Sequence, residues 1–312
     1  LIDQELRRKH PSLDVRPVIC DICECADIDR LFREIRPEIV YHAAAFKHVP
    51  MMEAHVAHAV HNNVFGTRNV VQAAAEQGAT FVLISTDKAV SPTNIMGTTK
   101  RLAEQLVLSF ATSRAQHCVA VRFGNVLGSN GSVVPLFSEQ IADGGPVTVT
   151  HPEATRYFMT SPEAVQLVLQ ASALDEARDR IVMLEMGQPV KIVDLARNLI
   201  RLSGLEPDVD IPIVYTGLRP GEKLHEQLTS DTEETMPTRY DKIRIVKTDA
   251  AKPFDHQLEQ LWDAVSSRDE RAIVRKLQEL VPEFSPQAAL IARLRDRSTS
   301  PEARQLTRGG AR

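Results

Sequence analysis

Short β-branched segments alternate with longer amphipathic segments over the first two-thirds of the chain. The predicted strands are Val15–Ile19, Glu38–His42, Thr80–Thr86 and His117–Phe123. The predicted helices are Ala26–Ile35, Glu53–Gln77 and Ile95–Arg114, the second of which ends at Gly78. This alternation is typical of β-α-β units, which build a doubly wound, mostly parallel sheet and place ligands beyond the carboxyl ends of the strands. The sequence therefore predicts an α/β fold whose chemistry follows the strands.

Composition and charge exclude several classes of protein. With 312 residues, 43% apolar and 25% charged, the chain has the composition of a globular protein. A net charge of −4 provides no basic field for nucleic acid. No apolar run reaches the roughly 18 residues of a membrane helix. Cys20, Cys23 and Cys25 form a run that lacks a second Cys/His pair, so we expect a reducing compartment and no metal site.

Glycine and proline punctuate the chain from about Asn125 onward, which predicts a smaller α+β lobe that binds substrate. We expect a Rossmann-like domain over residues 1–124, a partly interleaved substrate-binding lobe over 125–245, C-terminal helices over 246–297, and a flexible polar tail over 298–312.

The glycine-rich turn that opens a dinucleotide-binding fold does not occur in this sequence. Such a turn holds the cofactor's pyrophosphate at a helix N-terminus. We therefore expect the chain to begin in the helical segment after the second strand of that fold. On this hypothesis the first two strands are missing, and two strand edges are exposed.

The most specific pattern follows the third predicted strand. Ile84-Ser85-Thr86-Asp87-Lys88 precedes Met96-Gly97-Thr98-Thr99-Lys100, whose four-residue spacing places Met96 and Lys100 on one helical face. Together with residues 42–52 and 219–226, these segments resemble the CapD-like UDP-N-acetylglucosamine 4,6-dehydratases, a branch of the extended short-chain dehydrogenase/reductase superfamily. The resemblance covers roughly residues 1–245. It implies a Rossmann-like fold, NAD as cofactor with NADP as the alternative, and a UDP-sugar substrate.

The resemblance also implies catalytic roles. A 4,6-dehydratase oxidises C4 of the sugar, removes the C5 proton, expels the C6 hydroxyl and returns the hydride to C6. Lys88 is expected to be the base at C5, Asp87 the acid at C6, and Thr86 a hydrogen-bond donor to the C4 oxygen. Lys100 would hold the nicotinamide ribose. Met96 replaces the superfamily's usual Tyr, and because a thioether transfers no proton, the base for C4 oxidation stays open.

The neighbouring Asp87 and Lys88 would carry opposite charges in water, which are the wrong forms for an acid and a base. Burial raises the pKa of a carboxyl group and lowers that of an amine. We therefore expect a closed site to favour the neutral, proton-swapped pair, and a reaction rate that titrates with coupled apparent pKa values.

Further site residues are assigned by the same resemblance. For the cofactor they are Asp21, Ile22, Ala43, Ala44, Asn63 and Lys100. The planar guanidinium of arginine can donate two parallel hydrogen bonds to a diphosphate, and carboxylates accept hydrogen bonds from ribose hydroxyls. For the UDP-sugar the expected residues are Arg122, Asn125, Arg156, Arg219 and Glu222.

Two alternatives remain open. A nucleotide-sugar epimerase of the same fold needs no acid and base at C5 and C6, but such enzymes keep a Tyr where Met96 stands. A non-enzymatic, truncated remnant would bind NAD weakly without the glycine-rich turn. The resemblance further implies a homo-oligomer in the cytoplasm. Intact relatives often carry upstream membrane helices, which would place the domain at the cytoplasmic face of the inner membrane.

Overall fold

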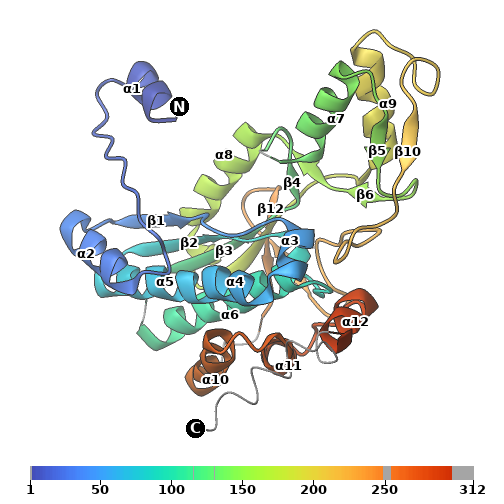
Figure 1. Ribbon diagram of the computed structural model, residues 1–312. Coiled ribbons are helices and arrows are strands. Elements are labelled where there is room, and N and C mark those ends of the chain that lie inside the picture. The colour runs from blue at the N-terminus through green and yellow to red at the C-terminus, as the bar shows by residue number, and fades with distance from the viewer. Residues whose placement is uncertain (1, 115, 130, 249–253, 297–312) are drawn as a thin grey trace.

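The computed structural model describes residues 2–114, 116–129, 131–248 and 254–296 (Figure 1). Its α-helices are α1 (Ile2–Lys9), α2 (Cys25–Ile35), α3 (Val49–Ala54), α4 (Val56–Val60), α5 (Thr67–Glu76), α6 (Ile95–Arg114), α7 (Val133–Ala142), α8 (Ser161–Ser172), α9 (Ile192–Leu202), α10 (Asp255–Ser266), α11 (Glu270–Leu280) and α12 (Ala288–Asp296). Its strands are β1 (Ile39–His42), β2 (Thr80–Ile84), β3 (Cys118–Arg122), β4 (Asn125–Val126), β5 (Val147–Val149), β6 (Thr155–Arg156), β7 (Phe158–Met159), β8 (Arg180–Leu184), β9 (Val190–Lys191), β10 (Ile213–Tyr215), β11 (Thr235–Pro237) and β12 (Ile243–Val246). The predicted tail over 298–312 lies outside the described residues.

Six strands form the main sheet in the order β1-β2-β3-β8-β12-β11. The first four run parallel, whereas β12 and β11 are antiparallel to their neighbours. Alternate side chains of β2 point to opposite faces: Phe81 and Leu83 pack against α2, α5 and α6, and Val82 packs against α8. Helices therefore cover both faces of the sheet, and the predicted doubly wound α/β fold is confirmed.

The predicted strand Val15–Ile19 is wrong. These residues form no strand, and Ile19 is fully exposed. Strand β1 pairs with β2 on one side, and no described strand pairs with its other edge. A β-strand needs a neighbour to satisfy its backbone N–H and C=O groups, so a β-branched segment without one stays irregular.

The predicted single helix Glu53–Gln77 is divided into several parts. His55, with φ −128°, separates α3 from α4, and a π-helix over His61–Gly66 separates α4 from α5. Gly66 lies against Ile22 so closely that an added Cβ would come within 2.6 Å of the Ile22 Cδ1 atom. The π-helix contains Asn63, whose side chain bonds the backbone of Phe46 in the segment after β1.

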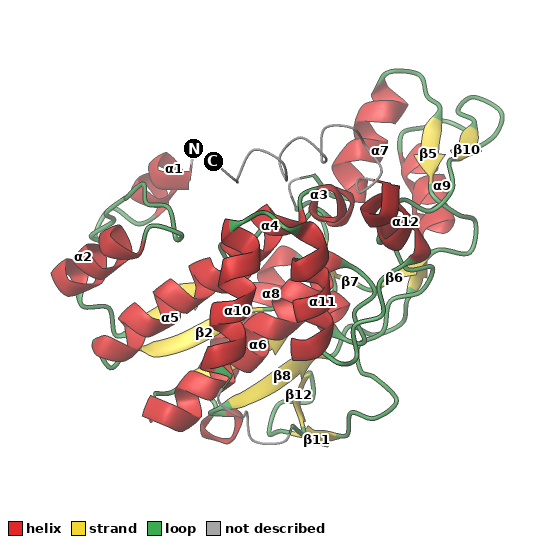
Figure 2. Cartoon of the chain, turned by 60° about the horizontal axis from the view of Figure 1, so that its bottom comes forward, coloured by secondary structure: helices red, strands yellow, loops and turns green. Residues whose placement is uncertain are grey.

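Two further groups of elements complete the molecule. Helices α7 and α9 enclose a second apolar core with β5, on the upper right of Figure 1. Helices α10, α11 and α12 pack against α3, α4 and α6, on the side that faces the viewer in Figure 2. Within the described residues, no helix combines the length and the apolar character needed to cross a membrane.

Candidate active site

A cavity of about 560 Å³ lies beyond the carboxyl ends of β1, β2 and β3. Parallel strands bring their carboxyl ends to one edge of the sheet, which is where ligands bind in folds of this class. Many of the predicted site residues line this cavity, namely Ala43, Thr86, Lys88, Met96, Lys100, Asn125, Arg156, Arg219 and Glu222. The segments after the three strands and residues 219–222 therefore meet around one space.

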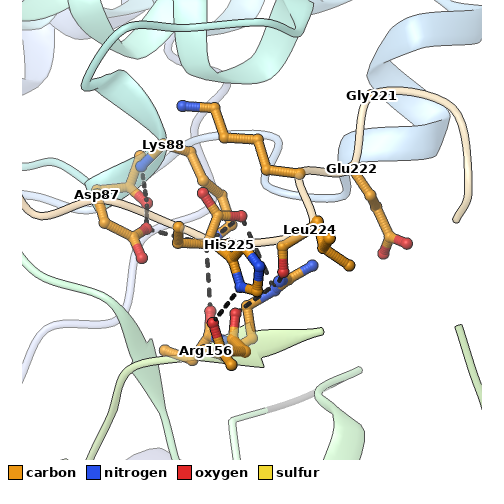
Figure 3. Close-up of polar contacts among 12 residues, drawn as sticks. Asp87, Lys88, Arg156, Gly221, Glu222, Leu224 and His225 are labelled. Atoms are coloured by element: carbon orange, nitrogen blue, oxygen red, sulfur yellow. Dashed lines mark hydrogen bonds and ion pairs between the residues drawn. The ribbon is translucent and has the colours of Figure 1, made fainter. Parts of the chain in front are cut away.

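Thr86, Asp87 and Lys88 form the turn that follows β2. The Thr86 hydroxyl donates to Asp87 Oδ1 at 2.9 Å and accepts from the Lys88 backbone N–H. The Lys88 ammonium donates to the same Asp87 oxygen at 2.9 Å, as Figure 3 shows, and to Asn125 Oδ1 at 3.3 Å. The Asp87 side chain is completely buried, and only Lys88 of the pair reaches the cavity wall. Asp87 therefore lies behind Lys88.

The predicted proton swap between Asp87 and Lys88 is not favoured by this arrangement. Burial by itself lowers the pKa of Lys88, but the carboxylates of Asp87 and Glu226 outweigh burial and raise that pKa above its ordinary value. The expectation from burial alone was wrong because it omitted Glu226, the second carboxylate. Lys88 is consequently an ammonium ion at neutral pH.

Lys100 differs from Lys88 in its surroundings. Burial lowers the pKa of Lys100 to about 8, against the opposing attraction of Glu104. No described residue accepts a hydrogen bond from its ammonium or forms an ion pair with it. Gly97 allows α6 to approach the turn after β2, because an added Cβ would lie 2.1 Å from the Lys88 carbonyl oxygen. Lys100 therefore presents free N–H donors to the cavity.

Some predicted cofactor residues lie away from this cavity. Asp21 accepts a hydrogen bond from the Cys23 backbone N–H at 2.8 Å, and Ile22 packs on Gly66. Ala44 is exposed but is not part of the cavity wall. The Asn63 amide is fully buried. It bonds the backbone N–H and C=O of Phe46 and the Thr99 hydroxyl, so it ties the segment after β1 to α6.

The predicted contact of Arg122 with the substrate is corrected by the structure. Arg122 is only 1% exposed, and its guanidinium donates twice to Glu104 and once to Glu233, each at 2.8 Å. All three nitrogen atoms of the group are thereby engaged, and Arg122 is not part of the cavity wall. Arg122 holds the sheet, α6 and the segment around Glu233 together and is not available to a diphosphate.

The segment over residues 219–226 supplies the remaining wall. Arg219 and Glu222 bond each other at the rim, with Arg219 Nε 3.0 Å from Glu222 Oε1. Gly221, with φ +82°, allows the close turn, since an added Cβ would lie 2.7 Å from Val49 Cγ1. Arg156 donates to the Leu224 carbonyl (Figure 3), which fixes the guanidinium beside this segment.

Glu226 is a residue of the site that the sequence reasoning did not assign. It is 7% exposed, and its Oε1 atom lies 3.7 Å from the Lys88 ammonium and 3.8 Å from Arg156 Nε. The only signal in the sequence was its place at the end of the charged segment 219–226. Glu222, four residues earlier, points away from Asp87 and Lys88 in Figure 3.

Comparisons with known proteins identify the family of this chain. The sequence profile of the family described as "Polysaccharide biosynthesis protein" matches residues 1–248. The capsular polysaccharide biosynthesis protein CapD of Staphylococcus aureus is 53% identical over 251 residues, which are 80% of this chain and 42% of that protein. This chain thus spans less than half the length of that relative.

Two solved structures are similar. Pen from Bacillus thuringiensis, at 33% identity, has a TM-score of 0.71 over 80% of this chain and 77% of its own. DesIV of Streptomyces venezuelae, a dTDP-glucose 4,6-dehydratase solved with NAD and TYD bound, shares the fold at 19% identity, with a TM-score of 0.64 over 72% of this chain and 74% of its own. On the extent of the profile match and the identity to CapD, this chain belongs to the polysaccharide biosynthesis protein family.

Proposed function

We propose that this protein is a nucleotide-sugar 4,6-dehydratase that converts UDP-N-acetylglucosamine, or a close UDP-linked relative, to a 4-keto-6-deoxy sugar for polysaccharide synthesis. The observation that carries the proposal is the placement of Lys88, held by Asp87, on the same cavity wall as Thr86 and Lys100. Epimerisation at C4 requires no acid and base at C5 and C6, so an epimerase would not need Asp87 and Lys88 here. Met96 also stands where an epimerase would need a proton-transferring Tyr.

The cavity suits a nicotinamide cofactor on one side. When bound, NAD supplies the acceptor for the C4 hydride and gives that hydride back at C6. Ala43 has no side chain beyond Cβ to obstruct a close approach, and Lys100 offers unused donors to ribose hydroxyls. Asn63 supports this side by fixing the segment after β1. We propose NAD on these grounds, with NADP as the alternative.

In this proposal Lys88 and Asp87 carry out the proton transfers. Lys88, as the neutral amine, takes the C5 proton, and the ammonium so formed passes one proton to Asp87, whose Oδ1 atom is 2.9 Å away. Asp87 then protonates the departing C6 hydroxyl, and the proton that the C4 hydroxyl releases on oxidation is returned through solvent to C5 when the hydride returns to C6. Because Asp87 lies behind Lys88, delivery to C6 proceeds past the Lys88 side chain. Thr86 donates to the C4 oxygen.

The opposite side of the cavity would hold the nucleotide. Arg156 and Arg219 supply positive charge for a diphosphate, and Glu222 supplies an acceptor for ribose hydroxyls. Arg219 and Glu222 bond each other in the structure, so nucleotide binding exchanges that mutual contact for contacts with the ligand.

Incubation of the purified full-length protein with UDP-N-acetylglucosamine tests the proposal. We expect a UDP-linked 4-keto-6-deoxy product whose mass is lower by one water molecule, identified by mass spectrometry and NMR. A product that differs only in configuration at C4 would instead establish an epimerase. Absence of turnover together with absence of NAD binding would favour the non-enzymatic alternative.

A second prediction concerns Gln287, which precedes α12 and lies beyond the family match. Its amide accepts from the Gly221 N–H and donates to the Glu222 carbonyl, both at 3.0 Å. Replacing Gln287 by alanine is expected to raise the KM for the nucleotide sugar roughly fivefold, since two neutral hydrogen bonds contribute about 1 kcal/mol net. Steady-state kinetics measure the KM of Gln287→Ala, and kcat should change less than KM.

The control for this prediction is Gln260→Ala. Gln260 lies in the same C-terminal group of helices but bonds His256 and Lys276, far from residues 219–226 in the sequence. Its KM is expected to equal that of the wild type. Equal KM values for Gln287→Ala and the wild type would contradict the assigned role.

A further inference from the structure

Glu226 is the second carboxylate beside Lys88. We propose that Glu226 is a positioning residue for Lys88, which together with Asp87 holds the amine at the cavity wall and governs when that amine can accept a proton. The inference rests on the proposed dehydratase function, because it concerns the group assigned to C5 of the sugar.

The geometry places Lys88 between carboxylates from distant parts of the chain. Asp87 Oδ1 lies 2.9 Å and Glu226 Oε1 lies 3.7 Å from its nitrogen. The Asp87 and Glu226 side chains are 0% and 4% exposed, whereas that of Lys88 keeps 15% at the wall. The second oxygen of each carboxylate is buried and has no hydrogen-bond partner among the described residues. Neither carboxylate therefore receives a full set of donors from the described residues, and each depends on nearby positive charge.

Four charged groups act on the Lys88 amine. Asp87 and Glu226 favour its protonated form, whereas Arg156 disfavours it, as does Lys223, which lies in the same segment as Glu226. Burial lowers the pKa of Lys88, but the two carboxylates prevail and raise it. Glu226 thus supplies part of the attraction that a catalytic base at this position must overcome.

The contact of Glu226 with Lys88 is separable from the fold of its segment. Lys223 donates to the backbone carbonyls of Val90 and Ser91, both at 2.9 Å, and so anchors residues 219–226 independently. Glutamine has the size of glutamate without its charge. Glu226→Gln is therefore expected to keep the segment in place while it removes the attraction on the ammonium.

The test is the pH dependence of kcat for sugar dehydration. In the wild type the rate should rise with pH as Lys88 loses its proton, and in Glu226→Gln the rise should level off about one to three pH units lower, the shift that a single neighbouring charge produces. The position of this rise does not depend on how much of the enzyme is active, so partial unfolding cannot imitate the shift. Glu226→Asp, which restores the charge, should move the rise back toward the wild type.

Glu222→Gln is the matched control, because it is the same substitution in the same segment but pairs with Arg219 and not with Lys88. Its KM is expected to change, whereas the position of the rise should stay with the wild type. A Glu226→Gln profile that coincides with the wild type, or a wild-type rate that does not rise with pH, would overturn the inference. A wild type that forms no 4-keto-6-deoxy product would instead overturn the proposed function itself.

Discussion

Replacement of Lys88 by arginine is expected to lower the rate of dehydration about 10²- to 10⁴-fold, the range that a general base contributes. The guanidinium keeps the positive charge that Asp87 and Glu226 face, but it does not lose its proton at any pH at which the protein is folded. Lys88→Ala would be less informative, because it would leave two buried carboxylates without their cation and would mix lost activity with lost stability.

Incorporation of solvent deuterium at C5 of the sugar measures this step directly. Lys88→Arg should abolish that incorporation while its thermal unfolding stays near that of the wild type. Lys247→Arg is the control, since Lys247 is exposed, pairs with Glu234 and is not part of the cavity wall, so exchange should proceed at the wild-type rate. Deuterium incorporation by Lys88→Arg at the wild-type rate would show that another group is the base.

Local patterns were sufficient to predict the centre of the fold. The structure has α6 over Ile95–Arg114 as predicted, and β1, β2 and β3 lie within the predicted strands. Each of these elements carries its own periodicity or its own buried apolar run. The segment Val15–Ile19 also contains β-branched residues but has no neighbouring strand, and pairing is a property of distant residues that a local pattern does not contain.

The residues of the candidate site were likewise predicted correctly where a local pattern places them and incorrectly where a distant partner does. Thr86 and Lys88 follow a strand, and Met96 and Lys100 share one face of the next helix, so the topology of a β-α unit brings them together. Arg122 was predicted wrongly because its direction is set by Glu104, a partner on another element. Glu226 was missed for the converse reason, since a loop residue has no periodicity that reveals which way it points.

The ion pair between Glu104 and Arg122 leads to the prediction with the largest effect on stability. Glu104 is fully buried and accepts hydrogen bonds from two nitrogens of Arg122 and from the Ser85 hydroxyl. Glu104→Gln is expected to lower the free energy of unfolding by about 3–5 kcal/mol, because it leaves a buried guanidinium short of its counter-charge. Chemical denaturation monitored by circular dichroism measures the change. Glu234→Gln, which removes the exposed pair with Lys247, should leave the free energy of unfolding unchanged within the error of the measurement.

The difference in free energy of unfolding between the wild type and Glu104→Gln is expected to depend on pH. Burial favours the neutral form of Glu104, but Arg122, Arg101 and the Ser85 hydroxyl outweigh burial and lower the pKa of Glu104 below its ordinary value of 4.5. A carboxyl group whose pKa is lower in the folded state stabilises the fold above the unfolded-state pKa, and this contribution is lost as the pH falls through the folded-state pKa. The wild type should therefore lose its advantage over Glu104→Gln below about pH 4.5 and keep it at neutral pH.

The double variant Glu104→Leu/Arg122→Met, which removes both charges, should recover much of the lost stability. A double variant no more stable than Glu104→Gln would show that the loss arises from packing and not from an unpaired charge.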